Sequence, residues 1–135
     1  MTRPANASTR FTLPASRRLR RQRDFARLYN ARCSVSDRHL IVYAVANGVG
    51  HPRLGLAVGK RFGNAVRRNR FKRLLREAFR LEQHAMPADF DYVLIPRLGP
   101  PAELADYRQS VRNLAADAAR KWQARQDRAA EGEPS

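Results

Sequence analysis

The sequence predicts one α/β domain in which helices pack against a β-sheet. The chain has 135 residues, which is enough to bury a core in a single domain without disulfide bonds. Its apolar residues, 43% of the total, follow a two-residue period in some segments and a helical period in others. These segments come in the order helix, two or three strands, helix, strand, helix. A helix between strands is typical of a βαβ unit, so we expect a crossover helix that packs on the sheet.

The two ends of the chain differ from its middle. Residues 1–16 are rich in Thr, Ser and Pro and predict a flexible basic and polar arm. Residues 125–135 are polar and predict a tail that frays. The folded domain is therefore expected over residues 17–124.

The first helix follows a stretch in which five of the seven residues 17–23 are arginine. Phe25 and Tyr29 are four residues apart, so they are neighbours on one face of this helix. Aromatic residues at this spacing usually belong to a core. Beside a run of cations, however, they also suit stacking against unpaired nucleic-acid bases, and both interpretations stay open here.

Two strand-like runs come next. Residues 38–46 have apolar side chains on both faces, which predicts a strand inside a sheet that is covered on each side. Residues 47–50 predict a turn or a hairpin connection to a second run over 54–59. Gly55 and Gly59 in that run suggest that the backbone closely approaches a neighbour.

A basic helix is predicted after these strands. Residues 59–80 contain nine Lys and Arg and one acid, Glu77. Asn64 is the expected N-cap, and Val66 falls outside the apolar stripe, so the first turn is expected to project past the body of the protein. The stripe that we expect to be buried consists of Phe71, Leu74, Leu75, Ala78 and Phe79.

The cations of this helix are expected on its opposite side. Arg73, Arg76 and Arg80 fall on one arc, with Arg70 and Lys72 at its flanks. A solvated helix face normally mixes charges of both signs, because like charges three or four residues apart repel each other. The lack of mixing favours a surface that binds a polyanion such as a nucleic acid.

The last third of the chain predicts one more strand and one more helix. The strand is expected over 90–97, where Pro96 stops it. The helix begins near Glu103 and keeps an apolar stripe as far as Trp122.

The whole chain is strongly basic, with a net charge of +15. Residues 1–76 carry 19 Lys and Arg and two acids, whereas residues 77–135 carry 8 Lys and Arg and 10 acids. A basic excess confined to one part indicates a binding surface. Cys33 is the single cysteine, so we expect it in the core of a protein from a reducing compartment. No apolar run has the length of a signal peptide or a membrane span, and the cytoplasm is the expected location.

No residues have the spacing of a catalytic or metal site. The histidines His39, His51 and His84 are scattered, and none lies at a metal-ligand spacing from another ligand. Asp89 and Asp91 are interpreted as residues at the start of a strand rather than as a ligand pair. The chain can therefore hold a nucleic acid but shows no means of cutting it.

The order of residues 60–79 resembles the protein subunit of bacterial ribonuclease P. The segment Gly-Asn-Ala-Val-Arg-Arg-Asn-Arg-Phe-Lys-Arg, with Arg68, Asn69 and Arg70 at its centre, matches the hallmark of that family. The likeness covers roughly residues 17–122. It implies an α-β-β-β-α-β-α two-layer sandwich like domain 2 of ribosomal protein S5, with a four-stranded sheet and a left-handed βαβ crossover.

The resemblance also implies a function. The family is an endoribonuclease that removes the 5′ leader from precursor tRNA, and its RNA subunit carries the catalytic site and the Mg²⁺ ions. The expected partners are therefore ribonuclease P RNA, with one protein per RNA, and the single-stranded 5′ leader of precursor tRNA, but no membrane. No catalytic residue and no metal ligand is expected in the protein itself.

The family's motifs imply three groups of RNA-binding residues. The aromatic residues of a central cleft that takes the leader would be Phe25, Tyr29 and Tyr43. The residues beside that cleft would be Lys60, Arg61 and Asn64. The basic helix would bind the catalytic RNA through Arg67, Arg68, Asn69, Arg70, Lys72 and Arg73. Arg76 of the same helix is also expected to bind RNA. Gly59 departs from the family, because many relatives have a small hydroxyl residue there.

Three alternatives are left open by the residues alone. The strongest is a ribosomal-type protein that binds rRNA and has no role in cleavage, because its composition would be the same. A membrane-surface helix over 64–80 is weaker, because the sheet needs the apolar face of that helix. A stand-alone nuclease lacks catalytic groups.

Overall fold

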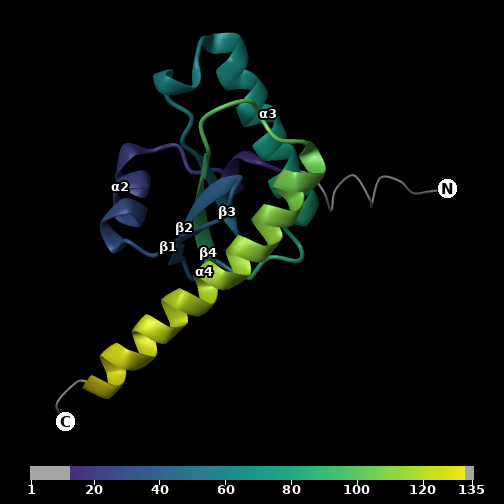
Figure 1. The fold of residues 1–135 in the computed structure, drawn as a ribbon. Helices are drawn as coiled ribbons and strands as arrows, with labels where there is room; N and C mark the ends of the chain where they lie inside the picture. Colours follow the sequence, from purple (N-terminus) through teal and green to yellow (C-terminus); the bar gives the residue numbers. More distant parts are fainter. Residues whose placement is uncertain (1–12, 133–135) are drawn as a thin grey trace.

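In the computed structural model, which describes residues 13–132, a four-stranded sheet packs with three helices (Figure 1). The elements, in chain order, are a 3₁₀ turn over Ala15–Arg17, helix α2 (Gln22–Ala31), strands β1 (Ser34–Ser36), β2 (Leu40–Ala46) and β3 (Arg53–Leu56), a second 3₁₀ turn over Lys60–Phe62, helix α3 (Ala65–Glu82), strand β4 (Phe90–Pro96) and helix α4 (Leu104–Gly132). This order confirms the expected α-β-β-β-α-β-α arrangement. Strand β1 could not be predicted from its own sequence, because three residues are too few to show the two-residue alternation of a strand.

The sheet has the strand order β1-β2-β4-β3. Strand β2 is antiparallel to both β1 and β4, whereas β3 is parallel to β4. The chain turns at residues 47–50 as predicted, with Gly48 and Gly50 at positive φ. The hairpin alternative is wrong, because β4 lies between β2 and β3 and keeps them from pairing. The parallel strands β3 and β4 are joined through α3, which is the predicted βαβ unit.

Strand β2 shows how the sheet is covered on both faces. Leu40, Val42 and Ala44 belong to the main core, which α3 and α4 complete. Tyr43 and Val45 belong to a second cluster, which includes residues of α2. Because successive side chains of a strand point to opposite faces, α2 lies on the other face of the sheet from α3 and α4 (Figure 1). The predicted two-sided burial of this strand is confirmed.

Helix α3 follows its predicted pattern. The Asn64 side-chain oxygen accepts a hydrogen bond from the backbone N–H of Arg67 at 3.0 Å, which caps the helix as expected. The first turn extends past the sheet (Figure 1), and Val66 is 77% exposed. The predicted stripe packs into the core, where Leu74 is partly buried and the fully buried members are Phe71, Leu75, Ala78 and Phe79.

Helix α4 is longer than predicted, and the expected fraying of residues 125–132 is wrong. The Arg125 guanidinium donates hydrogen bonds to the backbone oxygens of Ala31, at 2.6 Å, and Arg32, at 2.7 Å. Trp122 packs against the cluster on the α2 face of the sheet. These contacts hold the C-terminal half of α4 against the end of α2, and the helix continues to Gly132.

The structure tests only part of what was predicted for the two ends of the chain. Residues 1–12 of the predicted arm and residues 133–135 of the tail lie outside the described residues. Leu13 packs against the core. Cys33 is fully buried, as predicted. Within residues 13–132, no helix combines the length and the apolar character needed to cross a membrane.

Candidate nucleic-acid interface

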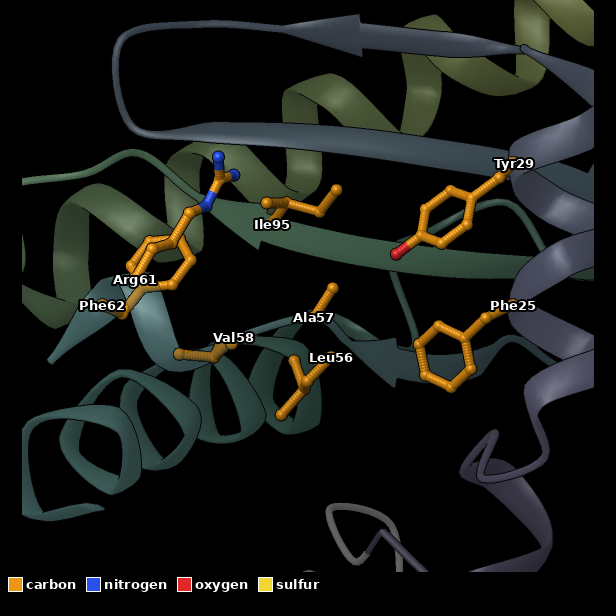
Figure 2. A pocket seen from close by; sticks show the side chains of 9 residues that line it. Phe25, Tyr29, Leu56, Ala57, Val58, Arg61, Phe62 and Ile95 are labelled. Carbon is orange, nitrogen blue, oxygen red and sulfur yellow. The ribbon is translucent and has the colours of Figure 1, made fainter. Parts of the chain in front are cut away.

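A cleft of about 440 Å³ opens between α2 and the segment that follows β3 (Figure 2). Phe25 and Tyr29 project into it from α2, and Arg61 and Phe62 face them from the second 3₁₀ turn. Apolar side chains line the rest of the cleft, from Leu56, Ala57, Val58 and Ile95. We call this the aromatic cleft. Its apolar walls with a cation at the edge suit a flat ring that is attached to a phosphate.

The three predicted aromatic residues form a connected row. The ring centroids of Phe25 and Tyr29 are 6.4 Å apart, and those of Tyr29 and Tyr43 are 5.1 Å apart at an interplanar angle of 81°. Tyr29 is 37% exposed, and the other two are half-buried, so none is sealed in the core. Tyr43 does not line the aromatic cleft but supports the Tyr29 ring edge-on from β2.

The Tyr29 hydroxyl is uncharged at neutral pH. Partial burial raises its pKa, and the neighbouring Tyr43 raises it further. A neutral phenol does not repel a phosphate and can donate a hydrogen bond to it.

Gly55 allows the Phe25 ring to lie directly on β3. A Cβ atom at residue 55 would lie 3.0 Å from two carbons of the Phe25 ring and 3.2 Å from a methyl carbon of Val93. The predicted close approach is therefore confirmed at Gly55. It is wrong at Gly59, which is exposed and where a Cβ would meet no atom within 4 Å.

A buried carboxylate holds α2 in place. Asp91, at the start of β4, is fully buried and forms ion pairs with Arg27 of α2 and Arg53 of β3. The Arg53 Nε lies 2.7 Å from Asp91 Oδ1, and the Asn47 amide donates to the same oxygen at 2.8 Å. Burial alone would raise the pKa of Asp91, but the hydrogen bonds from Arg53, Asn47 and Arg27 outweigh it and lower that pKa. Arg27 lies between Phe25 and Tyr29 in sequence, so this ion pair fixes the helix that carries both cleft aromatics.

A second buried acid joins α3 to α4. Glu82 is 2% exposed and accepts from Arg108 Nε at 2.7 Å and from Arg112 Nε at 2.8 Å. The prediction that Asp89 and Asp91 lie at the start of a strand is confirmed. Neither buried ion-pair cluster was predicted. Among the described residues, no three or more His, Cys, Asp or Glu side chains gather as a metal ion would require.

The cations of α3 between residues 67 and 76 differ in their partners from Arg80, near the end of the helix. No Lys or Arg of residues 67–76 forms an ion pair with an acid in the described part of the chain. The exposed members of the predicted set are Arg67, Asn69, Arg70 and Arg73, and the half-buried members are Arg68, Lys72 and Arg76. Arg80, expected on the same outward arc, instead forms an ion pair with Glu77 at 2.6 Å.

The residues expected beside the cleft have different positions. Arg61 lines it, with its guanidinium carbon 5.3 Å from the centroid of the Phe62 ring. Lys60 is exposed in the same turn but does not line the cleft. Asn64 is exposed, but its side-chain oxygen is occupied by the N-cap hydrogen bond.

A second, smaller cavity was not predicted. Its volume is about 190 Å³, and its cations are Arg18 and Arg20, from the segment before α2, and Lys72 and Arg76, from α3. We call it the basic groove. Two of its cations, Arg18 and Arg20, belong to the arginine run over 17–23 that the sequence shows. A run of charges does not indicate which other element of the fold it will lie beside.

Comparison with known proteins identifies similar chains. A family model described as Ribonuclease P matches residues 13–120. The ribonuclease P protein component of Thermotoga maritima is 38% identical over 102 residues, which cover 72% of this chain and 87% of that protein. The corresponding protein of Pelotomaculum thermopropionicum is 42% identical over 79 residues, which cover 58% of this chain and 70% of that protein.

Solved structures give the same result. The RNase P protein from Thermotoga maritima superposes with a TM-score of 0.68 at 34% identity, covering 74% of this chain and 96% of that one. The RNase P protein of Staphylococcus aureus superposes with a TM-score of 0.66 at 32% identity, covering 76% and 94%.

Proposed function

This chain belongs to the ribonuclease P protein family, as the protein component of a bacterial ribonuclease P, and from this premise we propose how it binds RNA. It binds the catalytic RNA of ribonuclease P and the single-stranded 5′ leader of precursor tRNA. By holding both, it assists the endonucleolytic removal of the leader that yields the mature 5′ end of the tRNA. One protein acts with one RNA.

The observation that carries this proposal is the position of the aromatic cleft next to cations that pair with no acid in the part of the chain that the structure describes. The leader is single-stranded, so its bases are free to stack on Phe25 and Tyr29, and such stacking is insensitive to sequence. Arg61 at the cleft edge neutralises the backbone beside the stacked bases without reading them. A site of this kind suits a class of substrates whose leaders differ in sequence.

The exposed end of α3 binds the catalytic RNA. The first turns of this helix extend past the sheet (Figure 1), so they can enter a fold of RNA without steric conflict from the body of the protein. The residues with this role are Arg67, Arg68, Asn69, Arg70 and Arg73. The uncompensated charge of the four arginines lowers the repulsion between two RNA molecules.

The protein aids cleavage through electrostatics and positioning. Mg²⁺ is held mainly by the RNA, which supplies the catalytic chemistry. The protein's cations reduce the repulsion between the catalytic RNA and the precursor, and this raises both substrate affinity and the occupancy of Mg²⁺ where the two RNAs meet.

Leader recognition is tested by comparing two ligands on the reconstituted holoenzyme. We expect precursor tRNA to bind more tightly than mature tRNA, because only the precursor has bases for the aromatic cleft. Phe25→Ala should remove about 1–3 kcal/mol of this difference, the usual contribution of one stacked base. Equal binding of precursor and mature tRNA by the unaltered holoenzyme would contradict the proposed role of the cleft.

A conservative variant serves as the control. Tyr29→Phe keeps the ring and removes the hydroxyl, so it should retain most of the preference for precursor, whereas Tyr29→Ala should lose it. Addition of this chain to ribonuclease P RNA should also restore leader removal at low Mg²⁺ concentration. If no cleavage is restored, the chain does not act as this subunit.

A further inference from the structure

The basic groove gathers four cations from two distant parts of the chain. Arg18 and Arg20 come from the segment before α2, and Lys72 and Arg76 come from the middle of α3. None of the four forms an ion pair with an acid in residues 13–132. The Nε of Arg18 is buried and has no hydrogen-bond partner among the described residues. Like charges that converge without an acid repel each other, and a bound anion would relieve this repulsion.

The backbone around the groove is fixed by the sheet. Arg18 forms a parallel bridge with Leu54 at the free edge of β3, and the N–H of the buried Leu19 donates to the Leu54 oxygen at 2.7 Å. The segment before α2 therefore adds one bridge to the edge of the sheet. This bridge fixes the backbone that carries Arg18 and Arg20, so that both side chains line the same groove as Lys72 and Arg76 of α3.

The basic groove continues the aromatic cleft. Leu56 of β3 lines both cavities, so they meet at this residue. The cleft, at about 440 Å³, is lined mainly by apolar and aromatic side chains, whereas the groove, at about 190 Å³, is smaller and lined by four cations and three leucines. The first suits bases and the second suits phosphates.

We propose that the basic groove binds backbone phosphates of leader nucleotides that lie beyond the nucleotides stacked in the aromatic cleft. This inference rests on the proposed function and assigns Arg18 and Arg20 to the substrate. It also assigns Lys72 and Arg76 to the leader rather than to the catalytic RNA. Recognition is by charge alone, so the groove responds to leader length and not to leader sequence.

The test measures affinity as a function of leader length. The holoenzyme is titrated with mature tRNA and with precursors whose leaders lengthen from about four to about sixteen nucleotides, the range of single-strand site sizes. With the unaltered protein, affinity should rise with length and then level off. With Arg18→Ala/Arg20→Ala, the shortest leaders should bind as before, and the longest should bind about 25-fold more weakly at 0.1 M salt, because each single-strand phosphate contact contributes about fivefold there. The salt slope for the longest leader should fall by about 1.4.

Two further variants complete the test. Arg18→Lys/Arg20→Lys keeps the charge and should retain most of the length dependence. Arg120→Ala/Arg128→Ala removes the same net charge from exposed positions of α4 and should leave the length dependence unchanged. Melting curves of each variant check that the fold is kept.

Two results would overturn the inference. One is an equal loss of affinity for all leader lengths and for mature tRNA, and the other is weaker assembly of the Arg18→Ala/Arg20→Ala protein with ribonuclease P RNA. Either result would assign the groove to another RNA surface. Failure of the proposed function looks different, because the unaltered holoenzyme would then gain no affinity from a leader of any length.

Discussion

Arginines around the two buried acids and arginines of the α3 segment 67–76 differ in what they contact. Arg27 and Arg53 both pair with Asp91, and Arg108 and Arg112 both pair with Glu82. The arginines of 67–76 pair with no acid among the described residues. The first set joins elements of the fold to one another, whereas the second set is the one that we propose binds RNA. The net charge of +15 is therefore a poor guide to the binding surface until the paired arginines are set aside.

The two sets also differ in how their charge is screened. Asp91 and Glu82 are buried but their arginines are partly exposed, so water weakens these ion pairs less than it weakens pairs in which both partners are exposed. The cations of residues 67–76 are exposed or half-buried and have no acid partner among the described residues, so salt can screen them. We therefore expect changes in the first set to affect folding stability and changes in the second set to affect the salt dependence of RNA binding.

The largest effect is expected from the loss of Asp91. Asp91→Ala leaves Arg27 and Arg53 without their shared carboxylate, and removing one side of a buried ion pair costs about 3–5 kcal/mol. The loss should be near the lower end, because the two arginine side chains are 39% and 28% exposed and can reach water. Urea unfolding measures it. A change below about 0.5 kcal/mol, the range of ordinary surface substitutions, would show that the cluster does not hold the fold.

Acid should destabilise the protein through the same two acids. Hydrogen bonds from arginines, outweighing burial, hold the pKa of both Asp91 and Glu82 below their ordinary values. Each carboxylate therefore stabilises the fold fully above its pKa in the unfolded chain, about 4, and this contribution is lost as the pH falls through the lower pKa of the folded state. Urea midpoints between pH 7 and pH 3 should fall less steeply for Asp91→Asn/Glu82→Gln than for the unaltered protein. Parallel curves would contradict the assignment.

A smaller loss of stability, with a specific loss of leader binding, is expected from Gly55→Ala. The added methyl would lie 3.0 Å from the Phe25 ring, and overpacking of this kind costs about 1–3 kcal/mol. The ring must move off β3, so preference for precursor over mature tRNA should fall while assembly with ribonuclease P RNA is kept. Gly59→Ala is the matched control, because a Cβ there meets no atom within 4 Å.

The elements that the sequence predicted well are those fixed by local pattern. The stripe through Phe71, Leu75 and Phe79 and the cap at Asn64 each depend on residues within a turn or two, so α3 could be placed from its own segment. The end of α4 could not, because its polar residues are held by Arg125 and its contacts with Ala31 and Arg32, about ninety positions away. Pairing over such distances has no local signature.

The sequence identified residues of the candidate site but not how they are arranged in space. The motif identified the α3 cations, and the spacing of Phe25 and Tyr29 placed them on one helix face, yet neither shows which side chains share a cavity. The separation of Tyr43 from the cleft and the convergence of Arg18 with Lys72 both depend on strand order, because β4 lies between β2 and β3. Charge, aromaticity and motif therefore predict what the surface binds, and topology decides where.

A modest effect is expected from Arg125→Ala, which removes the hydrogen bonds that tie α4 to the end of α2. These bonds join a cation to backbone oxygens at a half-exposed site, so their loss should cost about 1 kcal/mol. Urea unfolding measures this loss, and Arg128→Ala, at an exposed position of the same helix, should cost nothing measurable. If both variants unfold alike, the contact with α2 does not stabilise the domain.

The smallest effect on stability is expected from Arg70→Ala, although this variant should have a clear effect on RNA binding. Arg70 is exposed on α3 and pairs with no acid in residues 13–132, so Arg70→Ala should change the free energy of unfolding by less than about 0.5 kcal/mol. Binding to ribonuclease P RNA should nevertheless weaken, and a plot of log affinity against log salt should become shallower by about 0.7–0.9, the value for one lost phosphate contact. Arg112→Ala removes an equally exposed arginine that pairs with Glu82, and it should lower stability without changing that slope. An unchanged slope for Arg70→Ala would show that this arginine is solvated and contacts no phosphate. The lack of an acid partner would then not distinguish RNA-binding arginines from other exposed ones, and the contrast between the two sets would not hold.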